Sequence, residues 1–250
     1  MKKTRLLVAM TIALATAVGI SSCGNKNESK LPDGQPIGEG LFLVEQTAED
    51  GTKIVQLTDS TGYAVGSDYA AIADSGSYLA ARKADGAFEL LTLKGASFAN
   101  AASFEVKGYY ATSETAPTGK FIKTLIAANN NHLAFDATTH QKLIAVEGIK
   151  DEVLPLDNGF TFYKIKGLWG IAKADAEEPI TSDATEIAVI TTKAGKTYFW
   201  FNSKTNGAGV IDEAGKAVKR MSTSQFKLLK KGGKKLWEET GASGIAVKSI

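Results

Sequence analysis

The residues of this chain that could carry metal chemistry are few. His132 and His140 flank the segment LAFDATT, and Asp136 lies between them, so the three could be drawn as a metal site. They are the only two histidines, and the single cysteine, Cys23, lies far away at the N-terminus, so no third nitrogen or sulfur ligand is present. Eight residues of hairpin do not obviously bring the two histidines together. We expect neither a metal nor a cofactor.

Paired carboxylates could serve a glycoside hydrolase. Such pairs occur at Asp151-Glu152, Glu177-Glu178 and Glu238-Glu239. They are dispersed at expected turns and strand ends, where acidic side chains keep strand edges soluble. No serine stands in a Gly-x-Ser-x-Gly elbow. We therefore expect a protein that is not an enzyme, and we keep as the alternative a propeller-type hydrolase with carboxylates at one end of its ring.

Aromatic side chains concentrate in the segment TYFWFN, residues 197–202. In a strand, Tyr198 and Trp200 would share one face, and the two phenylalanines would occupy the other. A strand that is apolar on both faces is either central in a sheet or part of an interface. If it is an interface, Tyr198 and Trp200 are candidate ligand-binding residues. Trp169 is a third candidate, although packing between repeats explains it better.

The first 22 residues are typical of an export signal. Lys2, Lys3 and Arg5 precede an apolar run over residues 6–20. This run is shorter than the roughly 20 residues that a membrane-spanning helix needs. Residues 1–22 are therefore predicted to be a signal peptide.

The segment Ile20-Ser21-Ser22-Cys23 resembles a bacterial lipobox. The resemblance implies that the Cys23 sulfur carries a diacylglycerol and that acyl chains hold the protein on a membrane. Gly24, in place of an aspartate, favours the outer membrane in this family, facing either the periplasm or the exterior. Residues 23–40 are polar and rich in Gly and Pro, and they are predicted to be a lipidated flexible tether.

The overall charge argues against a nucleic-acid partner. The formal net charge is +2, and removal of the three basic residues of the signal would leave about −1. The run KLLKKGGKK, residues 227–235, is a local basic patch that we interpret as a solvated hairpin. The partners expected are a membrane, through the anchor, and a protein or glycan ligand.

A short motif recurs along residues 41–250, and we treat this span as one β-repeat domain. Its copies end at apolar residues spaced by 35, 45, 36, 39 and 35 positions, namely Val55, Leu90, Phe135, Ile171, Val210 and Ile245. A short run rich in aromatic and β-branched residues precedes each copy, as in strands. Turn signals such as AEDG, KADG and SKTNG separate each run from its copy. The recurring element is predicted to be a β-hairpin, present six times.

Five further strands are expected between the hairpins, and no segment has the convincing pattern of an amphipathic helix. These connectors are YAAIAD (69–74), SFEVKG (103–108), DEVLPL (151–156), TEIAVI (185–190) and QFKLLK (225–230). In the copy GLWGI, Gly170 would leave room for a neighbouring strand or a large side chain. Gly209 and Gly244 are the equivalent residues. The predicted fold class is all-β.

The pattern resembles the WG-repeat family of bacterial proteins. GLWGI, residues 167–171, carries the Trp-Gly pair, and GAGVIDEAGKAV, residues 207–218, carries the hydrophobic-acid and Gly-Lys parts of the unit. The first three copies lack the Trp-Gly pair. The family resemblance implies a β-rich scaffold for binding and names no ligand.

Units of about 38 residues with three or four strands have the size of a propeller blade. We favour a propeller-like arrangement of these hairpin repeats. The alternative is an open β-repeat array, or solenoid, in which each unit contacts only its neighbours. Five connectors for six hairpins fit a closed ring poorly.

Overall fold

The computed structural model describes residues 34–110, 116–192, 195–232 and 245–249. Within them the chain forms an all-β fold with one short helix. The elements are β1 (Gln35–Ile37), β2 (Leu41–Thr47), β3 (Lys53–Asp59), β4 (Ala64–Tyr69), β5 (Ala71–Asp74), β6 (Leu79–Arg82), β7 (Phe88–Leu91), β8 (Ser97–Ala101), β9 (Ser103–Tyr110), β10 (Pro117–Ile126), β11 (Asn131–Asp136), β12 (Lys142–Ile144), β13 (Glu152–Pro155), β14 (Phe160–Ile165), β15 (Leu168–Lys173), β16 (Thr181–Thr192), β17 (Thr197–Ser203), β18 (Gly207–Asp212), β19 (Ala217–Arg220), α1 (Thr223–Lys230) and β20 (Ile245–Ser249).

The strands form antiparallel meanders that we call units one to five. Units one to three are separate four-stranded sheets, β1–β4, β5–β8 and β9–β12. Units four and five share an eight-stranded sheet because β16 belongs to both. Its residues 181–184 pair with β15, and its residues 184–191 pair with β17. The C-terminal strand β20 pairs with the other edge of β16.

Most junctions between units are nearly continuous strands. Only Ala70 separates β4 from β5, and only Ala102 separates β8 from β9. The junction between units three and four is different, because residues 145–151 form an irregular connection between β12 and β13. Short junctions leave each sheet little choice except to stack on its predecessor.

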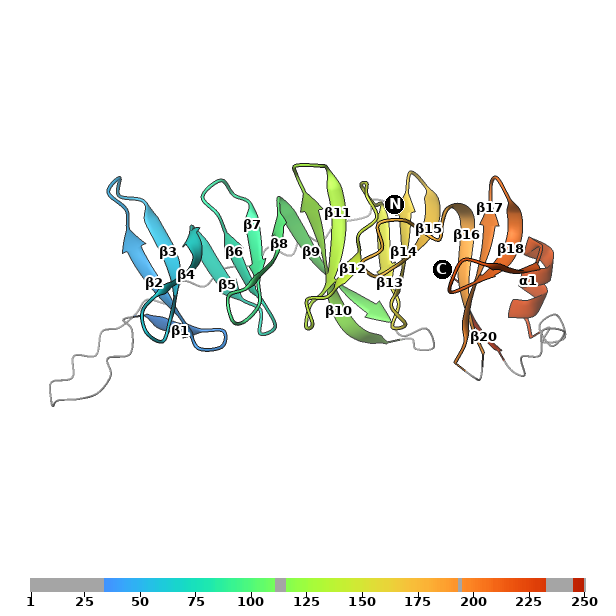
Figure 1. Ribbon diagram of the computed structural model, residues 1–250, viewed down its shortest axis with the longest axis horizontal. Helices are drawn as coiled ribbons and strands as arrows, with labels where there is room; N and C mark the ends of the chain where they lie inside the picture. Colours follow the sequence, from blue (N-terminus) through green and yellow to red (C-terminus); the bar gives the residue numbers. More distant parts are fainter. Residues whose placement is uncertain (1–33, 111–115, 193–194, 233–244, 250) are drawn as a thin grey trace, which may run out of the picture.

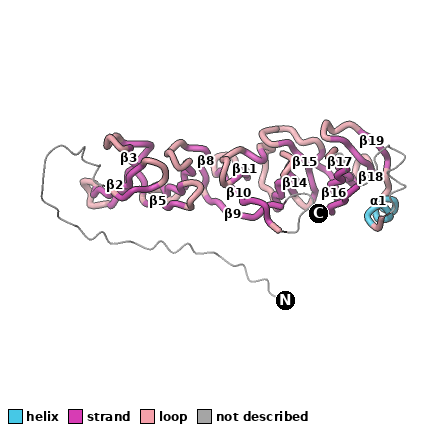
Figure 2. The backbone as a smooth tube through the Cα atoms, turned by 90° about the horizontal axis from the view of Figure 1, so that it is seen from below, coloured by secondary structure: helices cyan, strands magenta, loops and turns pink. Residues whose placement is uncertain are grey.

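The units follow one another in chain order along the long axis of the molecule (Figure 1). The view from below shows the same row (Figure 2). A propeller would place unit one against unit five, whereas these units lie at opposite ends of the row. None of the sheets in the described part of the chain closes on itself. The propeller-like ring is therefore not what these residues form, and the row has the order of the open array.

Each pair of neighbouring units encloses its own apolar core. Representative buried residues are Leu57 and Leu79 between units one and two, Leu90 and Ile122 between two and three, Phe121 and Tyr163 between three and four, and Phe162 and Phe199 between four and five. A single sheet exposes two faces, so these side chains leave water only when units stack. The fifth core, which contains Trp200, is closed by α1.

Five of the six predicted hairpins are confirmed: β2–β3, β6–β7, β10–β11, β14–β15 and β17–β18. They are the central pairs of the five units. Their turns contain the expected residues with positive φ, such as Gly51 (83°), Gly86 (87°) and Asn130 (53°). The sixth hairpin falls almost entirely on residues outside the described part of the chain.

Four of the five predicted connectors contain strands, and the fifth was wrong. QFKLLK lies in α1, so the basic run from Lys227 does not begin a hairpin. Ser222 caps this helix: its hydroxyl accepts a hydrogen bond from the backbone N–H of Gln225, whose side chain accepts one from the backbone N–H of Ser222. Phe226 and Leu229, three residues apart, are buried on one helix face. The eight-residue helix is too short to give a periodic pattern over three turns.

The predicted tether extends too far into the chain. Residues 35–37 pair with β2 as strand β1, and the backbone N–H of Glu39 donates to the carbonyl of Leu93 in unit two at 2.7 Å. Gly38 and Gly40, with φ of 57° and 73°, form the tight turn between β1 and β2. Their glycine-rich composition therefore marks a turn of the first sheet.

Gly170 makes room for an aromatic ring of the adjacent strand. It lies directly opposite Tyr163, and a Cβ at this glycine would stand 2.3 Å from the Cζ of that tyrosine. Gly119 and Tyr109 repeat the arrangement in unit three, where the corresponding distance is 2.4 Å. A ring lying over a cross-strand glycine fills the space that a side chain would occupy. The glycine therefore serves packing within its own unit.

Candidate functional site

Three adjoining hollows follow one edge of units three to five, and we call them together the edge groove. The middle hollow, of about 400 Å³, lies between the β15–β16 loop and the β18–β19 turn. The second, of about 540 Å³, lies between that turn and the β16–β17 turn. The third, of about 460 Å³, lies between unit three and the β15–β16 loop. Neighbouring hollows share walls, since Glu178 and Pro179 line two of them and Glu213 and Ala214 line two.

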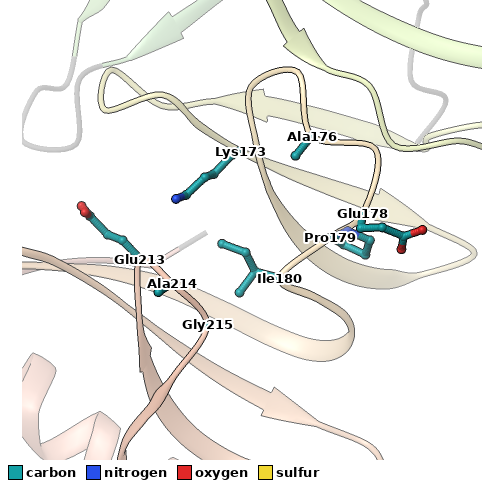
Figure 3. Close-up of a pocket in the computed structure, with 8 residues that line it drawn as sticks. All are labelled: Lys173, Ala176, Glu178, Pro179, Ile180, Glu213, Ala214 and Gly215. Atoms are coloured by element: carbon teal, nitrogen blue, oxygen red, sulfur yellow. The ribbon is translucent and has the colours of Figure 1, made fainter.

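The middle hollow has an apolar floor and charged sides. Ile180 and Pro179 line it together with Lys173, Glu178 and Glu213. The two carboxylates point in opposite directions, and the Lys173 side chain extends toward the Glu213 side (Figure 3). The Lys173 ammonium also lies 5.8 Å from the centre of the Phe160 ring. This geometry presents separate charges to a ligand and does not aim two carboxylates at one bond.

Carboxylates outnumber amines along the whole groove. Its lining includes five carboxylates and three lysines: Glu147, Glu177, Glu178, Asp212 and Glu213, with Lys142, Lys173 and Lys196. Asp212 is committed to its turn, because one of its oxygens accepts hydrogen bonds from the backbone N–H groups of Ala214 and Lys216, each at 2.9 Å. The remaining charged ends can pair with polar groups of either sign on a ligand.

The structure separates the three aromatic residues proposed as ligand contacts. Tyr198 lines the second hollow. Trp200 is 1% exposed, stacks on Phe226 with ring centres 3.9 Å apart and donates its indole N–H to the carbonyl of Met221 at 2.9 Å. Trp169 is also buried, under the ammonium of Lys164. Trp200 and Trp169 are core residues, and only Tyr198 lies where a ligand could touch it. Cys23 lies outside the described residues.

The two histidines have separate structural roles. His140 stacks on Phe98 with ring centres 4.6 Å apart, and its Nε2 lies 2.9 Å from the carbonyl of Ser77 in unit two. Nδ1 of His132 lies 3.1 Å from the backbone N of Lys150. Burial lowers the pKa of His132, and the neighbouring Lys123 lowers it further. Within the described ranges no three His, Cys, Asp or Glu side chains gather as a metal site would require.

Asp136 acts as a turn former, as we expected of the aspartates that end these strands. One of its oxygens accepts hydrogen bonds from the backbone N–H groups of Thr138 and Thr139, and the other accepts one from the hydroxyl of Tyr109. Burial alone would raise the pKa of this carboxyl, but these hydrogen bonds outweigh it and lower the pKa.

Lys150 is the most unusual charged residue in the described structure. It is 1% exposed, and its ammonium donates to the carbonyls of His132 (2.8 Å), Gly148 (3.0 Å) and Val146 and to the side-chain oxygen of Asn131 (3.2 Å). Burial lowers its pKa to about 8, and Lys123 adds to this effect. The ammonium thus holds the irregular junction between units three and four beside the third hollow, which Asn131 and Val146 also line.

Sequence patterns did not point to the edge groove, apart from Tyr198 and the Glu177-Glu178 pair. Its walls are turns from three units, and residues as distant as Asn131 and Glu178 meet there. The recurring turn glycines, such as Gly195 and Gly215, mark where such walls lie but not which of them adjoin. No helix among the described residues has the length and apolar character needed to cross a bilayer.

No family model and no curated protein matches this chain. Among solved structures, it is similar to the crystal structure of BamB from Moraxella catarrhalis, with 11% identity, a TM-score of 0.24, and coverage of 73% of this chain and 74% of that one. It is also similar to a crystal structure of the eukaryotic initiation factor, with 11% identity, a TM-score of 0.26, and coverage of 75% of this chain and 55% of that one. Likeness at this level supports no inference about function.

Proposed function

We propose that this chain is a lipid-anchored protein of the bacterial cell envelope that binds a protein or glycan ligand in the edge groove and catalyses no reaction. The observation that carries the proposal is the continuity of the groove across three units. An extended ligand could lie along it and contact several turns at once. Repeated units provide such length without any catalytic residue.

The N-terminal residues support the envelope location. A basic start, an apolar run and a lipobox-like end at Cys23 are together typical of exported lipoproteins. In this proposal residues 1–22 are a cleaved signal, and the acyl chains lie in the outer membrane. The repeats themselves would belong with the WG-repeat family, in an open array.

The alternative function is a hydrolase. It needs two carboxylates about 5–10 Å apart in one cleft. The opposite directions of Glu178 and Glu213 give this alternative less support than ligand binding (Figure 3).

Charge reversal in the groove tests the binding proposal. The chain carrying Glu147→Lys, Glu178→Lys and Glu213→Lys should lose at least about tenfold in affinity for whatever envelope component the native chain captures, since each lost charge contact is worth up to roughly 1 kcal/mol at an exposed site. A matched control carries Glu45→Lys, Glu49→Lys and Glu186→Lys, three exposed carboxylates away from the groove. Equal capture by both variants would place the binding surface elsewhere.

The anchor is tested separately by Cys23→Ala and membrane fractionation. Without the thiol no diacylglycerol can attach, so the protein should leave the membrane fraction. If the variant remains membrane-bound, lipidation at Cys23 does not hold the protein there.

A further inference from the structure

Charge is segregated between the two ends of the row. Residues 34–69, which form unit one, contain six carboxylates and one lysine, a net charge of −5. Residues 195–232, which hold β17–β19 and α1, contain eight basic residues and two carboxylates, a net charge of +6. Unit one and α1 lie at opposite ends of the molecule (Figure 1). The chain is therefore a rod with one acidic and one basic end.

The acidic end presents a sheet face that no other described unit covers. Successive strand residues alternate in direction, so Phe42 and Val44 of β2 share this face with Ile54 and Gln56 of β3, away from the core beside unit two. All four are partly exposed. Across the same face the Gln56 amide donates to a carboxylate oxygen of Asp68 at 3.0 Å. The face combines apolar surface with an exposed negative charge.

The basic end presents the outer side of α1. Phe226 and Leu229 point into the fifth core, which leaves Ser224, Lys227, Leu228 and Lys231 on the opposite side at helical spacing. Leu228 is 58% exposed, an unusual position for a leucine beside two lysines. This surface also combines an apolar side chain with charge, but the charge has the opposite sign.

We propose that these two end faces dock on each other, so that α1 of one copy covers the outer face of unit one in the next copy. The eight residues of α1 extend over about 12 Å, enough to cross two or three strands spaced by about 4.8 Å. The contact places Leu228 against Phe42, Val44 and Ile54 and brings Lys227 and Lys231 to the acidic unit. The last unit of each chain already solves the same problem in this way, since its own open face is covered by α1.

The proposed interface is heterologous, so it joins copies head to tail into open chains rather than closed dimers. Its attraction is mainly between exposed charges, which salt screens over about 8 Å at physiological ionic strength. The association is therefore expected to be weak and sensitive to salt. This proposal does not depend on the edge groove, because the two end faces lie outside it.

Sedimentation velocity of the chain from Gly24 onward, which keeps every described residue, tests the proposal. In roughly 50 mM NaCl the average mass should rise with protein concentration, and in roughly 500 mM NaCl the association should weaken by about tenfold or more. A mass that stays monomeric at all concentrations in the low-salt buffer would overturn the proposal.

Charge reversal at each end makes the test specific. Lys227→Glu with Lys231→Glu changes the basic end, and Glu49→Lys with Asp68→Lys changes the acidic end. Neither variant should associate alone, but an equimolar mixture should, because each altered end then meets an oppositely charged one. A mixture that fails to associate contradicts end-to-end docking.

The matched control for these variants carries Lys120→Glu with Glu186→Lys. Both residues are exposed and lie in the middle of the row, away from the two end faces. This variant should associate as the native chain does. If it too loses association, the attraction depends on overall charge and not on the two ends, and the proposal is wrong.

A second pair of measurements separates docking from misfolding and from membrane binding. Leu228→Ser changes only an exposed side chain and should weaken association while the fluorescence of buried Trp200 stays unchanged. Flotation with vesicles containing anionic phospholipid identifies the competing partner. If the monomeric native chain binds these vesicles through Lys227 and Lys231 and does not associate with itself, the basic end is a lipid-binding surface and the proposal is wrong.

Discussion

At the scale of single residues, polar side chains in this protein mostly satisfy turns and junctions. Asp59, Asp136 and Asp212 each accept hydrogen bonds from backbone N–H groups within the next four residues. Lys150 does the same task for the irregular junction after β12, but from inside the protein. A buried ammonium paired only with neutral oxygens is rare, because removal of its charge from water is costly. Its titration should therefore be visible in the stability of the whole chain.

The pH dependence of stability should identify Lys150. Its pKa is about 8 in the folded protein, against an ordinary value of 10.5. Between these values the unfolded chain binds a proton that the folded chain has lost, so the free energy of unfolding rises with pH by up to about 1.4 kcal/mol per pH unit from this residue. Urea denaturation at about pH 7.5 and about pH 10 should show this rise in the native chain and not in Lys150→Met.

Lys166→Met is the control for that measurement, because Lys166 is exposed in the β14–β15 turn. Its stability should follow the native pH dependence, which includes the other lysines and tyrosines. Parallel curves for the native chain and Lys150→Met would contradict the assignment.

At the scale of elements, the position of a glycine opposite an aromatic ring decides how closely two strands pack. Gly170 and Gly209 occupy the same place in the repeat, yet their surroundings differ. A Cβ at Gly170 would lie 2.3 Å from Tyr163 and 2.8 Å from the carbonyl oxygen of Thr181. A Cβ at Gly209 would meet nothing closer than the carbonyl oxygen of Lys219 at 3.4 Å. Equivalent glycines therefore have unequal importance.

Gly170→Ala should destabilise the protein by about 1–3 kcal/mol, because both the ring and a backbone oxygen must move. Gly209→Ala should change stability by less than about 1 kcal/mol, since its contacts are ordinary ones. Thermal unfolding of the two variants side by side measures the difference. Equal midpoints for the two variants would show that Tyr163 is not confined as described.

At the scale of the whole molecule, stability is distributed over stacked interfaces and is not concentrated in one core. The core between units one and two contains six buried residues, whereas that between units four and five contains ten. Unit one also lacks a described neighbour on its outer side, while α1 covers unit five. In such a row each unit is held mainly by its neighbours, so the two ends should differ in local stability.

Native-state hydrogen exchange should reveal this gradient. The amides of β2 and β3 should exchange at least about tenfold faster than those of β14 and β17, because opening unit one breaks only one small interface. Measurement in roughly 500 mM NaCl prevents end-to-end association from protecting unit one. Uniform exchange across all five units would indicate that the row unfolds as a single cooperative body.

Local sequence patterns were sufficient to specify the strands, because alternating apolar residues and turn glycines act on their immediate neighbours. They predicted five hairpins at their observed places and identified Gly170 as a space-making residue. The helix was missed because Ser222 and Gln225 act through a local cap, and two buried residues make too short a period to detect.

Three features followed from the stacking of sheets and from no local pattern: that the row stays open, that turns of units three to five adjoin as the edge groove, and that Trp200 lies beneath α1 while Tyr198 does not. Each depends on contacts between residues far apart in the chain. A strand pattern encodes which face of a residue's own strand is apolar, and the same pattern fits a ring and a row equally well.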